Sequence, residues 1–138
     1  MPVFAGEQDV YEKLGRLLEE MVADPILGLQ FQRADTVVQY VLDAPDAVLT
    51  ADVRIDSEPC VFLGPCELEP EVTMRMAADV AHRFFLGHVN VTVALARGEI
   101  HARGPVSKIL KLVPVVRPFF PRYQALLEAA GRTDLVTA

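Results

Sequence analysis

The sequence predicts an α+β fold in which helices pack on one side of a mostly antiparallel sheet. An amphipathic helical pattern opens the chain, alternating strand patterns follow it, and helical patterns return in the second half. Strands that come in a run, without a regular alternation with helices, are typical of this class. The length of 138 residues is that of one ordinary domain, so we expect residues 1–138 to form a single unit.

The first helix is expected over residues 7–24. Apolar residues recur there at three- and four-residue spacing, with acidic residues between them: Val10, Leu14, Leu17, Leu18, Met21 and Val22. Pro25 ends the pattern, because proline disfavours the helical conformation of the residue before it. Residues 26–34 fit either state, since their alternation of apolar residues is weakened by Gly28.

A β-hairpin is expected next. Residues 36–42 are β-branched and aromatic, residues 47–55 alternate in polarity, and Ala44-Pro45-Asp46 forms the turn. The inward face of the second strand is expected to carry Leu49, Ala51, Val53 and Ile55. A loop-rich segment with a short strand over 60–63 leads to residues 71–76, which alternate again. The inward residues of this strand are expected to be Val72, Met74 and Met76.

The pattern then changes to the helical period. Residues 78–86 predict a helix that Gly87 closes in the left-handed conformation. Residues 90–96 fit a strand or a helix on local propensity. A short strand is expected over 99–103.

Gly104-Pro105 suits the start of the next helix, because proline is tolerated at the first helical position. Its expected apolar stripe consists of Val106, Ile109, Leu110 and Val113. Pro114 and Pro118 are expected to break this helix. A last helix is expected over 121–130.

Charge and hydropathy exclude several classes of partner. The net charge of −6, without a strong basic cluster, disfavours nucleic acid. No run approaches the roughly 20 apolar residues of a membrane span, and the first residues do not form a signal-peptide pattern. We therefore expect no stable membrane insertion and a cytoplasmic location. The hydrophobic content of 51% fits a large core, an apolar cavity or an oligomer interface.

No spacing of reactive residues predicts a catalytic, metal or cofactor site. The histidines His82, His88 and His101 are too widely spaced for a compact metal site, and Cys60 and Cys66 do not form a CxxC motif. Phosphate-binding and nucleophile-elbow motifs are absent from the sequence. We expect no enzyme activity, no metal and no cofactor. Four cations could contact a lipid headgroup: Arg97, Arg103, Lys108 and Lys111. The favoured interpretation is that they are solubilising surface charges.

The order of segments from residue 36 to about residue 112 resembles the sterol carrier protein 2 family. The hairpin TVVQYVLDAPDAVLTADV comes first, and the strand EVTMRM then runs into AADVAHRFFLG. NVTVALARG, GEIHARG and the helix PVSKILKLV follow in that order. The matching positions are Phe84, Gly87, Ala94, Leu95, Gly98, Ile100 and Gly104. Ala77 and Pro105 depart from the usual pattern, and the segment VVRPFFPRYQALLEAAG is less typical.

The resemblance implies a five-stranded sheet, helices packed on it, and an apolar cavity enclosed between them. It also implies that 90–97 is helical and that the ligand is a sterol, a fatty acyl chain or a phospholipid. The family has no shared catalytic residues. The residues expected to line the cavity are Met74, Met76, Phe84, Phe85, Leu95, Ile109, Leu112, Val116, Phe119 and Phe120. For each of them, plain hydrophobic core is the alternative.

We expect a protein that binds a lipid-like ligand, and transfer of that ligand is a further function that the resemblance leaves open. A structural or dimerisation module, whose apolar surface packs against itself or a partner, is the first alternative. A small enzyme that acts on an apolar substrate ranks last. Phe119-Phe120, between Pro118 and Pro121, fits a lid, an exposed dimer contact or a satellite core cluster.

Overall fold

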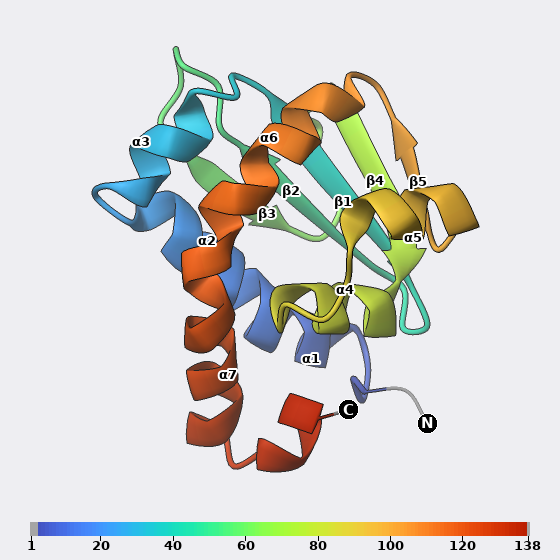
Figure 1. Cartoon of the computed structure of the whole chain (residues 1–138). Coiled ribbons are helices and arrows are strands. Elements are labelled where there is room, and N and C mark those ends of the chain that lie inside the picture. Colours follow the sequence, from blue (N-terminus) through green and yellow to red (C-terminus); the bar gives the residue numbers. More distant parts are fainter. Residues whose placement is uncertain (1–2, 138) are drawn as a thin grey trace.

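In the computed structural model, which describes residues 3–137, helices cover one face of a five-stranded sheet (Figure 1). The strands are β1 (Val37–Asp43), β2 (Ala47–Asp52), β3 (Cys60–Leu63), β4 (Val72–Ala77) and β5 (Ile100–Arg103). The α-helices are α1 (Glu7–Val10), α2 (Arg16–Ala23), α3 (Leu27–Gln32), α4 (Ala78–Phe85), α5 (Val91–Arg97), α6 (Val106–Val116) and α7 (Phe120–Ala129). A π-helical turn η1 (Tyr11–Gly15) and two 3-10 helices, η2 (Arg117–Phe119) and η3 (Thr133–Thr137), complete the elements.

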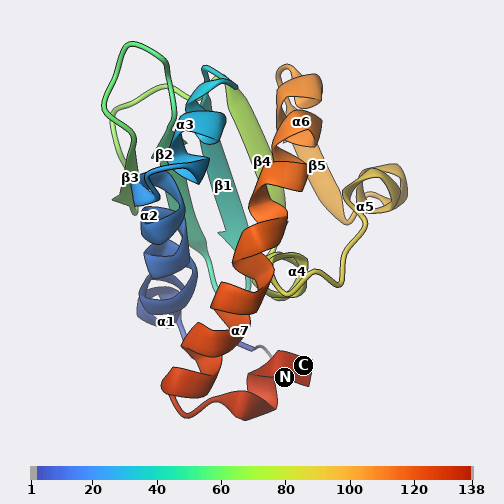
Figure 2. The ribbon, with the colours of Figure 1, turned by 60° about the vertical axis from the view of Figure 1, so that its left-hand side comes forward.

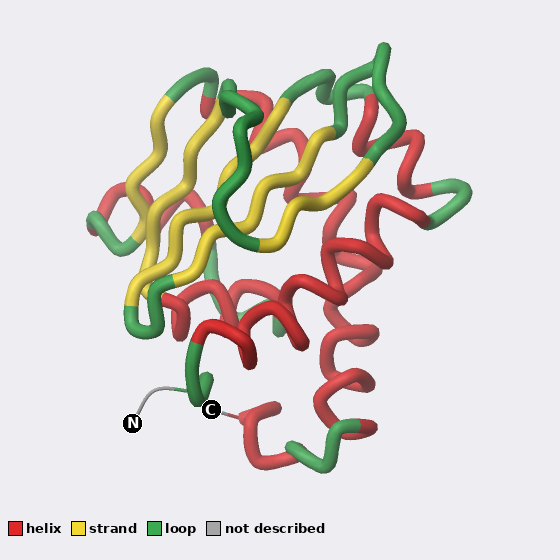
Figure 3. The backbone as a smooth tube through the Cα atoms, turned by 180° about the vertical axis from the view of Figure 1, so that it is seen from behind, coloured by secondary structure: helices red, strands yellow, loops and turns green. Residues whose placement is uncertain are grey.

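The sheet has the strand order β3-β2-β1-β4-β5. The pair β1–β4 is parallel, with Tyr40 opposite Met74, and the other three pairs are antiparallel. The predicted α+β class with a mostly antiparallel sheet is therefore confirmed. Because β3 and β4 lie on opposite sides of the β1–β2 hairpin, residues 64–71 cross the face of the sheet that the helices leave uncovered (Figure 3).

The inner face of the sheet carries the apolar residues that the alternation predicts. Leu49, Ala51 and Val53 are buried on β2 and just after it, as are Val72, Met74 and Met76 on β4. Ile55 is the exception, and its predicted inward position is wrong: the side chain is 66% exposed. The strand ends at Asp52, and the Ser57 amide donates to the carbonyl of Arg54, so the chain turns away before Ile55 can join the inner face.

The segments α1, η1 and α2 follow one another with helical backbone angles, so residues 7–23 form the first helix as predicted. The ambiguous segment that follows is helix α3. The carboxylate of Asp24 accepts hydrogen bonds from the amides of Ile26 and Leu27, at 3.0 and 2.8 Å. Asp24 therefore satisfies amides at the start of α3 that have no partner within the helix.

The segment that fitted strand or helix is helix α5, in agreement with the family resemblance. The side chain of Asn90 caps it by accepting from the Val93 amide at 3.1 Å, and Gly98 ends it in the left-handed conformation.

Helix α6 continues through Pro114 to Val116, so the predicted break at Pro114 is wrong. A proline inside a helix removes only one backbone hydrogen bond, while Ile109 and Val116 stay buried on either side of it. Leu110 was expected on the inward stripe but is 42% exposed on the outer side of the helix. The side chain of Val106 lies outside the part of the chain that the structure describes.

Candidate functional site

Helix α6 lies across the inner face of the sheet (Figure 2), and two small apolar hollows remain beneath it. Each has a volume of about 30 Å³. The first lies between β4, α4 and α6, and the second lies toward α2 and α3. Their walls are almost entirely hydrocarbon, so the space between sheet and helices suits an apolar occupant.

Seven of the predicted cavity residues line the first hollow: Met74, Met76, Phe84, Phe85, Ile109, Leu112 and Val116. The other three lie elsewhere. Leu95 packs, half-buried, against the core from α5. Phe119 is fully buried, with Phe31 on one side and the guanidinium of Arg122 4.7 Å from its ring centre. Phe120 is half-buried and packs edge-on against Phe84 at 6.1 Å between ring centres.

Tyr40, Leu112 and Val116 line both hollows and therefore form the partition between them. A shift of these three side chains would join the two hollows into one space along α6. Among the described residues that line the two hollows, Tyr40 alone has a side chain with a polar hydroxyl group. Burial raises the pKa of Tyr40 to about 12, so its hydroxyl is a neutral hydrogen-bond donor at physiological pH.

Tyr40 is not among the residues predicted from the sequence, although its position on β1 carries a signal for it. Tyr40 alternates with Val38 and Leu42 on β1, which places it on the same inner face as Leu49 and Met74. A tyrosine at an inward position of a central strand is a candidate for a wall that is mainly apolar but carries one polar group.

A larger groove of about 620 Å³ opens beside the first hollow. The segment from Gly87 to Thr92 forms one wall, and Leu110, Pro114 and Arg117 lie on the other. Three side chains line both the groove and the first hollow: Phe84, Val91 and Val113. These three side chains form the wall between the hollow and the groove.

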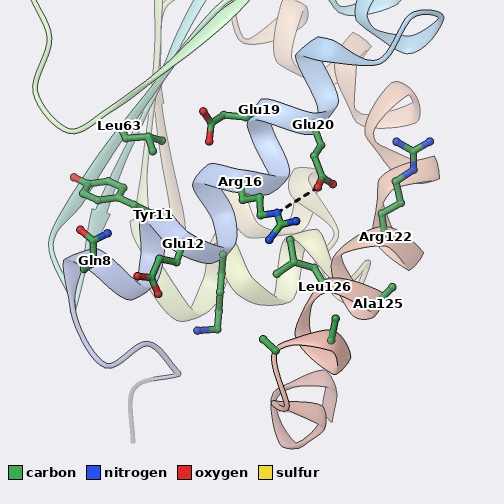
Figure 4. Close-up of a pocket in the computed structure, with 13 residues that line it drawn as sticks. Gln8, Tyr11, Glu12, Arg16, Glu19, Glu20, Leu63, Arg122, Ala125 and Leu126 are labelled. Carbon is green, nitrogen blue, oxygen red and sulfur yellow. Dashed lines mark ion pairs between the residues drawn. The ribbon is translucent and has the colours of Figure 1, made fainter.

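A second groove, about 820 Å³, lies between the first helix and α7 and has a different character (Figure 4). Several charged side chains line it, among them Arg16 and Glu20, which form an ion pair at 3.5 Å. It shares no lining residue with either hollow among the described residues. Its charges make it unsuitable for an apolar ligand.

The remaining candidate groups from the sequence are dispersed. His82 is buried beside Tyr123, His88 lines the 620 Å³ groove, and His101 is exposed on β5. Within residues 3–137, no three His, Cys, Asp or Glu side chains lie together as a metal ligand set. No helix of the same residues is long and apolar enough to cross a membrane.

The four cations that could meet a lipid headgroup according to the sequence are not part of this site. Lys108 is bound to the carboxylate of Glu71 at 2.9 Å and to the carbonyl of Asp35. Arg97, Arg103 and Lys111 are exposed and line neither the hollows nor the 620 Å³ groove.

Comparison of the sequence with protein-family models gives no match, and comparison with curated proteins gives none either. Solved structures do match. Sterol carrier protein 2 from Yarrowia lipolytica, in its apo form, superposes with a TM-score of 0.65 at 12% identity, over 77% of this chain and 88% of that chain. The sterol carrier protein domain 2 of Helicoverpa armigera gives 0.64 at 16% identity, over 85% and 91%. Palmitated SCP2L2 from Aedes aegypti gives 0.58 at 19% identity, over 78% and 93%. The chain therefore has the fold of the sterol carrier protein 2 domains.

Proposed function

We propose that this protein binds and transfers a lipid-like ligand, a sterol, fatty acyl chain or phospholipid, between the inner face of the sheet and helix α6. The observation that carries the proposal is the pair of apolar hollows beneath α6, separated only by side chains. The Aedes aegypti protein of the same fold is palmitated, which supports an acyl chain as one candidate.

Entry of such a ligand requires α6 to move, because each hollow of about 30 Å³ holds roughly one water molecule. A ligand pocket usually has roughly 300 Å³ or more. An acyl chain gains about 0.8 kcal/mol for each buried methylene, so a chain of about 15 methylenes makes about 12 kcal/mol available for displacing the helix. Pro114 weakens α6 in its second half by removing one backbone hydrogen bond, which favours such a movement.

Binding without catalysis is part of the proposal. Acid–base catalysis needs a group that exchanges a proton near neutral pH. Tyr40 is the polar side chain of the hollow walls in the described part of the chain, and burial holds its pKa at about 12. A cytoplasmic location and the absence of a nucleic-acid partner stay predictions from the sequence.

Two measurements test the proposal. Mass spectrometry of organic extracts from the purified protein should find bound lipid, and titration with a fluorescent fatty acid should give saturable binding. Leu112→Trp places a large side chain at the partition and should weaken that binding about tenfold or more. The matched control is Leu126→Trp, a half-buried leucine that lines only the charged groove. Equal binding by both variants and the wild type contradicts a site beneath α6.

The narrowness of the hollows favours a second candidate, a structural or dimerisation module. Hollows of only about 30 Å³ each leave little free space for a ligand. Ile26 and Leu29 also expose apolar side chains, which are 72% and 62% exposed. A ligand-free extract, no binding of the fluorescent fatty acid and a stable homodimer in sedimentation would favour this candidate over the first.

A further inference from the structure

We propose that the 620 Å³ groove is the headgroup site for an anionic amphiphile, with Arg117 and His88 binding a carboxylate at the mouth of the first hollow. The tail would pass between Phe84, Val91 and Val113, which line both spaces. The inference rests on the proposed function, because it requires that the hollow receive the tail.

The charge of the groove supports an anionic partner. The chain has 19 acidic and 13 basic residues, yet no Asp or Glu lines this groove among the described residues. The larger groove, in contrast, is lined by Glu12, Glu19 and Glu20. An anion that approaches Arg117 therefore meets no carboxylate on the walls.

Arg117 is exposed and forms no ion pair within residues 3–137. Its guanidinium is charged at any physiological pH and presents a fork of donors that matches a carboxylate. Other exposed arginines, such as Arg97, also lack an ion pair there, but they do not line the groove. Arg117 differs from these other arginines because it lies beside the apolar hollow.

The wall opposite Arg117 is held in a fixed backbone conformation. The amide of His88 donates to the carbonyl of Arg83 at 2.9 Å. Gly87 has a φ of 88°, and a Cβ atom there would lie 2.8 Å from the ring of Phe120. The turn therefore packs closely on Phe120, whose ring meets Phe84 edge-on. An apolar passage that begins at Phe84, with the cation Arg117 at its outer rim, is the arrangement that an amphiphile needs.

A purely structural role for Arg117 gives a different expectation. Arg117 caps the carboxyl end of α6, where a cation interacts favourably with the helix dipole. If that were its whole role, its loss would lower the stability of the protein but would not discriminate between a charged and a neutral headgroup.

The experiment compares cis-parinaric acid with its methyl ester, which has the same tail and no charge. Arg117→Gln should weaken binding of the acid about 5–10-fold and leave the ester within about twofold. Adding His88→Gln should weaken the acid further, and Arg117→Lys should restore part of the loss. Arg97→Gln is the matched control, since Arg97 is exposed outside the groove.

Each outcome bears on one of the two proposals. Equal effects of Arg117→Gln on acid and ester, or no effect on either, overturn the headgroup site while lipid binding stands. A wild-type protein that binds neither probe overturns the proposed function and the headgroup site with it. Raised salt should weaken the acid and not the ester, because screening acts on the exposed charge.

Discussion

The Nδ1 atom of His82 lies 2.7 Å from the hydroxyl oxygen of Tyr123, and both side chains are fully buried. On the other side of the ring, Nε2 lies 2.8 Å from the carbonyl oxygen of Leu135. A carbonyl only accepts, so Nε2 carries the proton and Nδ1 accepts from the tyrosine hydroxyl. The neutral imidazole therefore satisfies all three groups and ties α4 to α7 and η3.

This arrangement predicts a loss of stability in mild acid. Burial lowers the pKa of His82 below its ordinary value of about 6.5, so the unfolded chain binds the proton first as the pH falls. His82 thus contributes fully above about pH 6.5, and its contribution decreases below that pH. Between about pH 7.5 and 5.5 the free energy of unfolding should fall by up to about 1.4 kcal/mol through this group. Urea denaturation at the two pH values measures the change.

His82→Gln removes the titrating group, while the amide can still donate to the carbonyl of Leu135. The variant should be less stable than the wild type at the higher pH but should lose less stability on acidification. His101→Gln is the control, because His101 is exposed on β5. An unchanged pH dependence in His82→Gln would show that other groups cause the acid sensitivity.

Leu112→Ala should join the two hollows, because Leu112 lines both of them. Removal of a half-buried leucine side chain should lower the free energy of unfolding by about 2 kcal/mol. The larger space should at the same time raise the affinity for a fluorescent fatty acid, since less of α6 has to move. The control Leu126→Ala should lower stability without raising affinity. An affinity of Leu112→Ala equal to that of the wild type would place the ligand elsewhere.

The turn between β5 and α6 depends on Gly104. Its φ is 92°, and a Cβ atom there would lie 2.1 Å from the carbonyl oxygen of Glu71. Gly104→Ala should therefore lower the free energy of unfolding by about 3 kcal/mol or more, from backbone strain and steric clash together.

Gly131 separates these two effects, because its φ is 73° and a Cβ atom there would meet no described atom within 4 Å. Gly131→Ala should cost only about 1 kcal/mol. Equal losses in the two variants, measured by chemical denaturation, would show that the contact with Glu71 relaxes freely.

Periodicity sufficed to predict most of the fold, because it reports which residues face a core. The first helix and the inward faces of β2 and β4 follow from spacing alone. The parallel pairing of β1 with β4 does not, because it depends on a connection that crosses the sheet and has no local pattern. Ile55 was misplaced for a related reason: the alternation continues past the residue at which the strand ends.

The sequence pattern predicts which residues of the site face inward, but not how they fit together. Seven expected lining residues meet in the first hollow because each faces inward from a strand or helix. The volume of the hollow depends on how side chains from distant segments fit together, which a sequence pattern does not contain. Arg117 lies four residues after Val113 and so on the same side of the chain, but its place beside a groove depends on the turn after α4.

Pro114 provides the most direct test of whether α6 is the moving part. Inside a helix, proline lacks the amide that would donate to the carbonyl of Leu110, so Pro114→Ala should add a hydrogen bond and raise the free energy of unfolding by about 1–3 kcal/mol. A stiffer α6 should also slow the association of a fluorescent fatty acid in stopped-flow measurements. Pro121→Ala is the control, because Pro121 lies in the first turn of α7, where no such bond is lost. Higher stability with an unchanged association rate would mean that the ligand enters without displacement of α6.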